Sequence, residues 1–246
     1  SQVSDLLINT WTATCSEDLQ NYAIKMIKVT GGTHIPNSAF YQMSTLEEII
    51  IPETITNIDA NAFYQCANLK DMKIPDAVKE MGAHTFDGCA ALKTVPYGKN
   101  LKMIGDYAFA NCTGLIGDET AIEVSNTYTK IGAGAFSNCT NLQNITIPDT
   151  ITFVGNNAFE NCTSLTELVI PDSVETMGTN MLNGCTNLES LTIPFASTSK
   201  GYAYSGGNDA YSQVSDLFIN TWAATCNENL KDYAIKTIEV TGGTRI

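Results

Sequence analysis

Apolar positions recur along this chain with a period of about 23 residues. An aromatic or leucine residue is followed three positions later by cysteine or methionine, in the pairs Phe40/Met43, Phe63/Cys66, Phe86/Cys89, Phe109/Cys112, Phe136/Cys139, Phe159/Cys162 and Leu182/Cys185. Successive first members are 23, 23, 23, 27, 23 and 23 residues apart. A fixed period of this size predicts a solenoid, because one such unit cannot bury its apolar face alone.

Each repeat reads Ala-Phe-x-x-Cys-x-x-Leu-x-x-Ile-x-Ile-Pro-Asp-x-Val-x-x-Ile-Gly, with substitutions. The Ile-x-Ile piece predicts a short strand with both apolar residues inward and the middle residue outward. Proline ends the strand, and the aspartate after it is typical of a turn. Glycine before the next Ala-Phe is expected to supply a permissive backbone, at Gly82, Gly105, Gly132, Gly155 and Gly178.

Two repeats deviate from the pattern. Val95-Pro96-Tyr97 puts proline at the outward middle position of a strand. Four extra residues enter within 116–121 and predict a surface loop, because the core spacing resumes at Ile122-Glu123-Val124. Gly117-Asp118-Glu119 has oxygen ligands for a cation, but a plain solvated loop is the favoured interpretation.

The two ends of the chain are copies of each other. Ser1–Ile35 matches Ser212–Ile246 at 26 of 35 positions, with an offset of 211 residues. This predicts a parent protein with long units of about 211 residues. The expected organisation is a start-of-unit segment (1–23), the solenoid (24–195), a Gly/Ser/Tyr-rich loop (196–211) and the start of the next unit (212–246).

A strand is expected in each of the two copied segments. The first should lie near Lys25–Val29, and Thr237–Val240 should add a final strand to the same sheet. The apolar patch that includes Leu6–Ile8 has no clean period and is expected to be irregular or partly helical, and Ser16–Leu19 is typical of a helix start.

The repeated Ala-Phe-x-x-Cys-x-x-Leu-x-x-Ile-x-Ile-Pro pattern resembles the BspA-like, or Treponema-type, leucine-rich repeats. The resemblance covers Lys25–Pro194 and returns at Ile235–Ile246, with departures at Met43, Leu182, Pro96 and Ser125. It implies a β-rich, right-handed leucine-rich-repeat solenoid, with short strands in a parallel curved sheet and short helical or 3-10 turns on the other side. It also implies secreted or surface-attached proteins that adhere to host proteins or other cells.

The charge and apolar content narrow the classes of partner. The 246 residues carry a net charge of −13, and such an acidic chain lacks the basic face that nucleic acid and anionic membrane surfaces require. There is no run of 18 apolar residues, so no membrane insertion is expected.

Six of the eight cysteines occupy the slot that Met43 fills in the first repeat. Buried free thiols are therefore favoured over disulfides between neighbouring rungs, and metal binding is less favoured still.

The sequence offers little for catalysis. Its two histidines, His34 and His84, stand at variable positions, and there is no phosphate-binding glycine motif. We therefore expect a non-enzymatic protein without a cofactor.

The remaining candidate is the outward surface of the strands, since solenoids bind partners on such extended faces. The predicted face comprises Glu48, Ile50, Lys70, Asp71, Lys73, Lys93, Glu123, Asn144, Thr146, Glu167, Val169 and Thr192. The expected partner is a host extracellular-matrix, serum or cell-surface protein or glycan, and reversing the charges of Lys70, Lys73 and Lys93 should weaken that binding. Ordinary solvated strand residues and a passive spacer that presents another domain are the alternatives.

Overall fold

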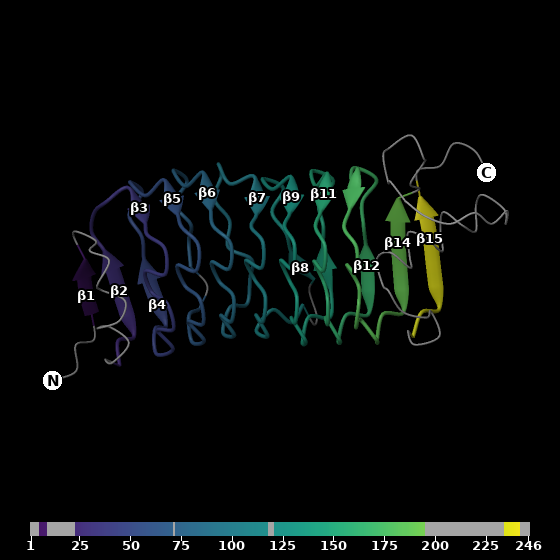
Figure 1. The fold of residues 1–246 in the computed structure, drawn as a ribbon, viewed down its shortest axis with the longest axis horizontal. Coiled ribbons are helices and arrows are strands. Elements are labelled where there is room, and N and C mark those ends of the chain that lie inside the picture. The colour runs from purple at the N-terminus through teal and green to yellow at the C-terminus, as the bar shows by residue number, and fades with distance from the viewer. Residues whose placement is uncertain (1–4, 9–22, 71, 118–120, 195–233, 242–246) are drawn as a thin grey trace.

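The chain forms an elongated solenoid whose coils stack along one axis, with β1 at one end and β15 at the other (Figure 1). This computed structural model describes residues 5–8, 23–70, 72–117, 121–194 and 234–241. None of these residues is in a helix, so the helical or 3-10 turns expected opposite the sheet are replaced there by hydrogen-bonded turns. The described part therefore also has no helix that could cross a membrane.

The Ile-x-Ile strands form one parallel column, as the alternation predicts. Its members are β1 (Asp5–Ile8), β2 (Met26–Val29), β4 (Glu48–Ile50), β8 (Ile122–Glu123), β10 (Ile145–Thr146), β12 (Glu167–Val169), β14 (Ser190–Pro194) and β15 (Thr237–Thr241). They pair in the orders β1-β2-β4, β8-β10 and β12-β14-β15, always with parallel strands. The rungs at 72–74 and 95–97 carry no regular strand.

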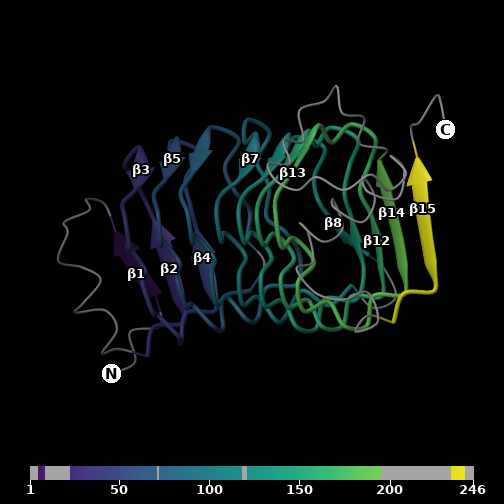
Figure 2. The same cartoon turned by 45° about the vertical axis from the view of Figure 1, so that its right-hand side comes forward.

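A second column of strands precedes the repeated glycine, and the sequence analysis did not predict it. Its members are β3 (His34–Ile35), β5 (Asn57–Ile58), β6 (Glu80–Met81), β7 (Met103–Ile104), β9 (Lys130–Ile131), β11 (Phe153–Val154) and β13 (Thr176–Met177). They pair in parallel in the orders β3-β5-β6 and β7-β9-β11-β13. Figure 2 shows the two columns as separate rows of arrows along the solenoid. Most coils in the described part thus have strands on two sides.

The Ala-Phe turn closes the third side of each coil. Its backbone N–H groups donate to the following coil, as in Phe63 N to Thr85 O at 2.9 Å. The buried Phe40, Phe63, Phe86, Phe109, Phe136 and Phe159 rings form a continuous stack. Neighbouring ring centroids are 5.3 to 5.7 Å apart, within the range of favourable stacked pairs.

The repeated cysteines lie beside this stack, in the inward slot that the sequence predicts. All six are buried free thiols. Each Sγ donates a hydrogen bond to the phenylalanine carbonyl oxygen of the preceding coil, at 2.9 to 3.2 Å. Cysteine therefore acts as a small apolar side chain that also links one coil to the next.

The repeated glycines have a different role from the one expected. They do not adopt positive φ; the left-handed positions are two residues before and two after each phenylalanine, as at Asn157 and Asn161. A Cβ on Gly155 would instead lie 2.5 Å from the backbone nitrogen of Ala133. Glycine is required here because two backbones approach closely, not because the chain needs conformational freedom.

The rung at 95–97 departs from the usual alternation after Val95, which is buried as expected. Pro96, expected outward, is buried, and the side chain of Tyr97 is 58% exposed. The buried Tyr128 donates its hydroxyl hydrogen to the carbonyl oxygen of Pro96 at 2.7 Å. Proline has no N–H to contribute to the ladder, so the rung loses its strand and a tyrosine from the next coil contacts it instead.

The outermost strands confirm one expectation and correct another. β15 pairs in parallel with β14, so the predicted final strand of the sheet is present. β1 is also a strand, whereas the sequence pattern predicted irregular or partly helical structure there. The proposed helix start at Ser16–Leu19, Asp118 and Glu119 of the inserted loop, and the Gly/Ser/Tyr-rich segment lie outside the described residues.

Candidate interaction face

The outward side chains of the first strand column form a continuous surface, called here the strand face. Its middle positions align directly, as in the pairs Lys28/Ile50, Glu123/Thr146 and Val169/Thr192. The parallel pairing keeps the same repeat position on the same side of every coil. The face is thus a product of register as well as of alternation.

Eleven of the twelve predicted site residues lie among the described residues, and all eleven are exposed or half-buried. Nine are exposed, namely Glu48, Ile50, Lys70, Lys73, Lys93, Glu123, Thr146, Glu167 and Val169. Asn144 and Thr192 are half-buried, and the Nδ2 of Asn144 donates to the Gly117 carbonyl oxygen at 3.1 Å. Asp71 lies outside the described residues.

A shallow concavity of about 680 Å³ lies over β2, β4 and the rung at 72–74 of the strand face. It is lined by Lys25, Met26, Glu47, Glu48, Ile49, Ile50, Ile51, Glu53, Lys70, Met72 and Lys73. Four of the predicted site residues, Glu48, Ile50, Lys70 and Lys73, therefore share one surface depression. Its apolar side chains are Met26, Met72 and the isoleucines of β4 and its end.

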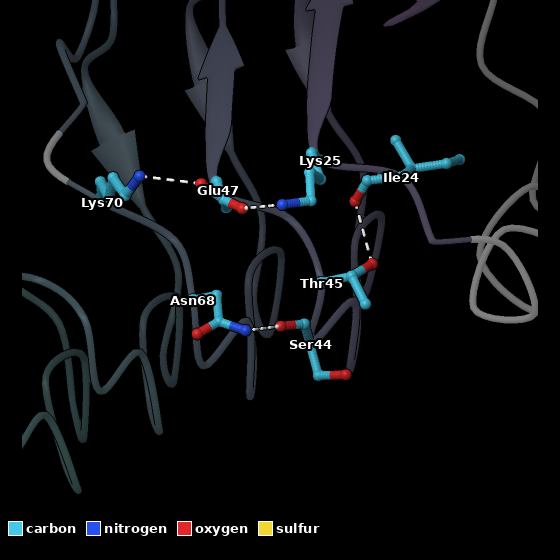
Figure 3. Close-up of polar contacts among 7 residues, drawn as sticks. All are labelled: Ile24, Lys25, Ser44, Thr45, Glu47, Asn68 and Lys70. Atoms are coloured by element: carbon cyan, nitrogen blue, oxygen red, sulfur yellow. Dashed lines mark hydrogen bonds and ion pairs between the residues drawn. The ribbon is translucent and has the colours of Figure 1, made fainter. Parts of the chain in front are cut away.

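Ion pairs between rungs neutralise much of the charge around this concavity. Glu47 binds the Nζ of Lys25 at 2.7 Å and that of Lys70 at 2.8 Å (Figure 3). Lys73 pairs with Glu53 at 2.6 Å. The glutamates of the β4 rung thus pair with lysines of the neighbouring rungs, because residues 20 to 23 apart in sequence lie on adjacent coils.

The titration of Glu47 reflects this arrangement. Hydrogen bonds from Lys25 and then Lys70 lower its carboxyl pKa from 4.5 to about 2. The partner lysine likewise lowers the pKa of Glu53, and the pKa values of Lys70 and Lys73 are raised by their glutamates. All four side chains are exposed enough for solvent to screen these pairs, so they orient the surface more than they stabilise the fold.

Asparagine and threonine side chains near these ion pairs donate hydrogen bonds to the backbone of the neighbouring coil. Asn68 Nδ2 donates to the Ser44 carbonyl oxygen at 2.7 Å, and Thr45 Oγ1 donates to the Ile24 carbonyl oxygen at 2.9 Å (Figure 3). Asn141 and Asn187 repeat the asparagine contact further along. These bonds fix the spacing of the rungs that carry the face.

The exposed aliphatic residues on the strand face remain without an intramolecular explanation. Ile50 is 42% exposed and Val169 is 45% exposed, and both occupy middle positions where the neighbouring rungs carry lysine or threonine. Exposed apolar side chains are common singly, but an apolar centre within a polar rim is also the usual layout of a protein interface.

Sequence reasoning missed the outward side of the second strand column. Met103 and Phe153 are 47% and 36% exposed there. The sequence does carry a signal for this second column. Most repeats have a polar or large residue, then Ile, Val or Met, and then glycine, as in Lys130-Ile131-Gly132. That alternation is only two residues long in each coil, too short to distinguish from a turn by pattern alone.

The described residues hold no cluster of acidic, histidine and cysteine side chains arranged for a metal ion. His84 Nδ1 lies 2.9 Å from Asp87 Oδ2, and its ring stacks on Tyr107 at a centroid distance of 4.9 Å. Burial raises the pKa of Cys66 and of Cys139 to about 12, so these thiols are poor nucleophiles at neutral pH.

A family model for the BspA type leucine rich repeat region, with six copies, matches residues 19–117 and 118–213. The chain belongs to this family. Its repeats are leucine-rich repeats, which confirms the resemblance drawn from the sequence.

Two solved structures share the fold. A leucine rich cell surface protein from Faecalibacterium prausnitzii is 21% identical with a TM-score of 0.50, and the match covers 90% of this chain and 61% of that one. The leucine rich repeat protein of T. pallidum is 22% identical with a TM-score of 0.52, covering 66% and 72%. This chain therefore spans less than two thirds of the first of these proteins. No curated protein matches the chain.

Proposed function

We propose that the chain is a non-enzymatic, adhesin-like module of a secreted or cell-surface protein, and that it binds a partner protein through the strand face. The partner class is a host extracellular-matrix, serum or cell-surface protein or glycan. The observation that carries the proposal is the pair of exposed aliphatic residues, Ile50 and Val169, set among charged and polar side chains on one continuous face. The cell-surface description of the Faecalibacterium prausnitzii protein supports the location.

Several charged side chains of the strand face are already paired with one another, which limits how a ligand can bind there. Lys70 and Lys73 already have carboxylate partners, so a ligand must either replace those pairs or bind between them. Apolar contact at Ile50, in the 680 Å³ concavity, and at Val169 requires neither. A few such buried contacts supply most of the affinity in protein interfaces.

The test measures binding of the purified chain to immobilised extracellular-matrix and serum glycoproteins by surface plasmon resonance. The Ile50→Ser/Val169→Ser variant should bind its partner at least about tenfold more weakly, as loss of interface anchors does. The matched control is Met103→Ser/Phe153→Ser, which removes comparably exposed apolar side chains from the second strand column. Equal weakening by both variants, or no effect of the first, would remove the strand face as the binding surface.

Charge reversal is a less selective test than the sequence suggests. In a Lys70→Glu/Lys73→Glu/Lys93→Glu variant, new carboxylates would face Glu47 and Glu53 across the rungs. Like-charge repulsion would then disturb the face even where no ligand binds. Methionine at the same positions removes the positive charge without that repulsion and is the better comparison.

A passive spacer is the second candidate function, and the in-register docking of β15 on β14 favours it. A spacer needs a stiff, extendable rod and no conserved binding contacts. If the folded chain binds none of the immobilised proteins while the parent protein does, the spacer function accounts for the module better than adhesion.

A further inference from the structure

β2 and β15 are corresponding strands of the two copied segments. Met26–Val29 and Thr237–Val240 are 211 residues apart, and both place isoleucine and valine at the second and fourth positions. Each pairs in parallel with one strand on its N-terminal side of the solenoid, β1 in the first case and β14 in the second. Corresponding strands of the two copied segments thus have different neighbours.

The two neighbours occupy the same register. Leu6 pairs with Ile27 and Ile8 with Val29, while Leu191 pairs with Ile238 and Ile193 with Val240. β1 reads Asp-Leu-Leu-Ile, and the corresponding part of β14 reads Ser-Leu-Thr-Ile. The apolar alternation of the two strands is therefore the same, and either one satisfies the edge that the β2 sequence presents.

The charges at this edge also match. Lys236 binds Glu189 of the preceding rung at 2.8 Å, and its counterpart Lys25 binds Glu47 of the following rung at 2.7 Å. A β14 strand docked on β2 would bring Glu189 to the other side of Lys25. The alternating row Glu189–Lys25–Glu47–Lys70 would then continue across the junction without a like-charge contact.

We propose that the edge of β2 covered by β1 is a docking site for the β14 end of a second copy of this chain, and that β1 is a replaceable strand. In a tandem array the preceding unit supplies that β14. Successive units then form one unbroken solenoid, and each adds about 38 Å, from eight rungs at ~4.8 Å. This inference does not depend on the adhesive role of the strand face.

The experiment opens one edge in each of two full-length variants. Thr237 N donates to the Glu189 carbonyl oxygen, so the N–H of Glu239, two residues on, also faces β14. Glu239→Pro removes that N–H at an exposed position and should free β14. By the same register the N–H of Leu6 faces β2, and Leu6→Pro should free the edge of β2.

An equimolar mixture of the two variants should double in mass by light scattering, while each variant alone stays monomeric. Leu7→Pro, whose N–H faces away from β2, is the matched control and should not pair with Glu239→Pro. The Leu6→Pro/Glu239→Pro double variant has both edges free and should form open chains that lengthen with concentration.

The register gives a second readout. Thr192 aligns with Glu239, whose counterpart is Lys28, so docking places Thr192 of one copy beside Lys28 of the other. Cysteines at these two positions would have Cα atoms within disulfide range. Lys28→Cys in the Leu6→Pro variant and Thr192→Cys in the Glu239→Pro variant should therefore crosslink on oxidation. A mixture that stays monomeric and uncrosslinked, with both variants folded by circular dichroism, would overturn the proposal.

Discussion

At the scale of single residues, the charges of the strand face are set by partners one coil away. Glu47 lies between Lys25 and Lys70, which belong to the rungs on either side of it. Lys25 is 22 residues and Lys70 is 23 residues from Glu47 in the sequence, so sequence order alone does not pair these lysines with the glutamate. The solenoid period makes the contact.

The first prediction concerns this carboxylate. In a Lys25→Met/Lys70→Met variant, the pKa of Glu47 should rise from about 2 toward 4.5, because the hydrogen bonds that lower it are gone. Since the native pKa is depressed, the pairing is complete above pH 4.5 and is lost as the pH falls toward 2. Side-chain carboxyl NMR shifts recorded against pH measure this directly. A wild-type value near 4.5 would contradict the ion pairs.

At the scale of elements, the close approach of neighbouring coils decides which side chains are allowed. Gly155 belongs to the glycine repeated before Ala-Phe, whereas Gly98 stands where most other repeats have proline. A Cβ on Gly155 would collide with the backbone of Ala133 and Gly132, whereas one on Gly98 would lie 3.1 Å from the Pro75 carbonyl oxygen. Backbone atoms cannot move aside without shifting a whole rung.

The second prediction compares these two glycines. Gly155→Ala should lower the free energy of unfolding by about 3 kcal/mol, at the upper end for overpacking, and Gly98→Ala by about 1 kcal/mol. Urea denaturation of both variants measures the two losses, provided that the slope of unfolding free energy against urea concentration is the same for both. If the two alanines cost the same, close coil approach is not the reason for glycine at position 155.

The phenylalanine stack ends at Leu182, and the adjacent residue compensates for the smaller side chain. Met181 is buried where the other repeats mostly have alanine, as at Ala158. The side chain is larger at position 181 and smaller at position 182 than in the other repeats. We therefore expect these two neighbouring core positions to share one space.

The third prediction tests that expectation. Leu182→Phe alone should destabilise the protein by about 1–3 kcal/mol, because Met181 leaves no room for the ring. Met181→Ala/Leu182→Phe should recover most of that loss and extend the ring stack by one member. Thermal unfolding of the single and double variants measures the coupling between the two positions. Additive losses would show that they do not share one space.

At the scale of the whole molecule, the row of thiols links stability to pH. Burial raises the pKa of Cys66 and Cys139 to about 12, and those of Cys89, Cys112 and Cys162 well above 9.0. These thiols stay protonated in the native state, while in the unfolded chain they ionise near pH 9.0. Their contribution is therefore complete below pH 9 and is lost as the pH rises toward the native values.

The fourth prediction follows from that linkage. At pH 10 the free energy of unfolding should be lower than at pH 8, by about 1 kcal/mol for each thiol that ionises only in the unfolded chain. Cys66→Ala/Cys139→Ala should weaken this dependence on pH, whatever its effect on stability at pH 8. Urea unfolding at the two pH values tests both statements. Equal stability at pH 8 and pH 10 would contradict the buried, protonated thiols.

The sequence by itself determined the solenoid, its core and the outward positions of the first strand column. Leu69, Met72 and Ile74 recur at fixed spacing in other rungs, and polarity alone assigns them to the inside. The slot shared by Met43 and the six cysteines predicted buried thiols for the same reason. Eleven of the twelve predicted site residues lie in the described part of the chain, and all eleven are exposed or half-buried. Whether they bind a partner is a separate, functional question.

Only the tertiary structure decided what depends on the neighbouring coil. It turned Pro96 inward and Tyr97 outward, made Gly155 a steric requirement and paired Lys70 with Glu47. It also placed the corresponding strands β2 and β15 beside different neighbours, β1 and β14. Periodicity reports each residue's preference for water or core, which is local in sequence. Clashes, ion pairs and edge pairing depend on distances between residues about one period apart, and those distances exist only once the coils are stacked.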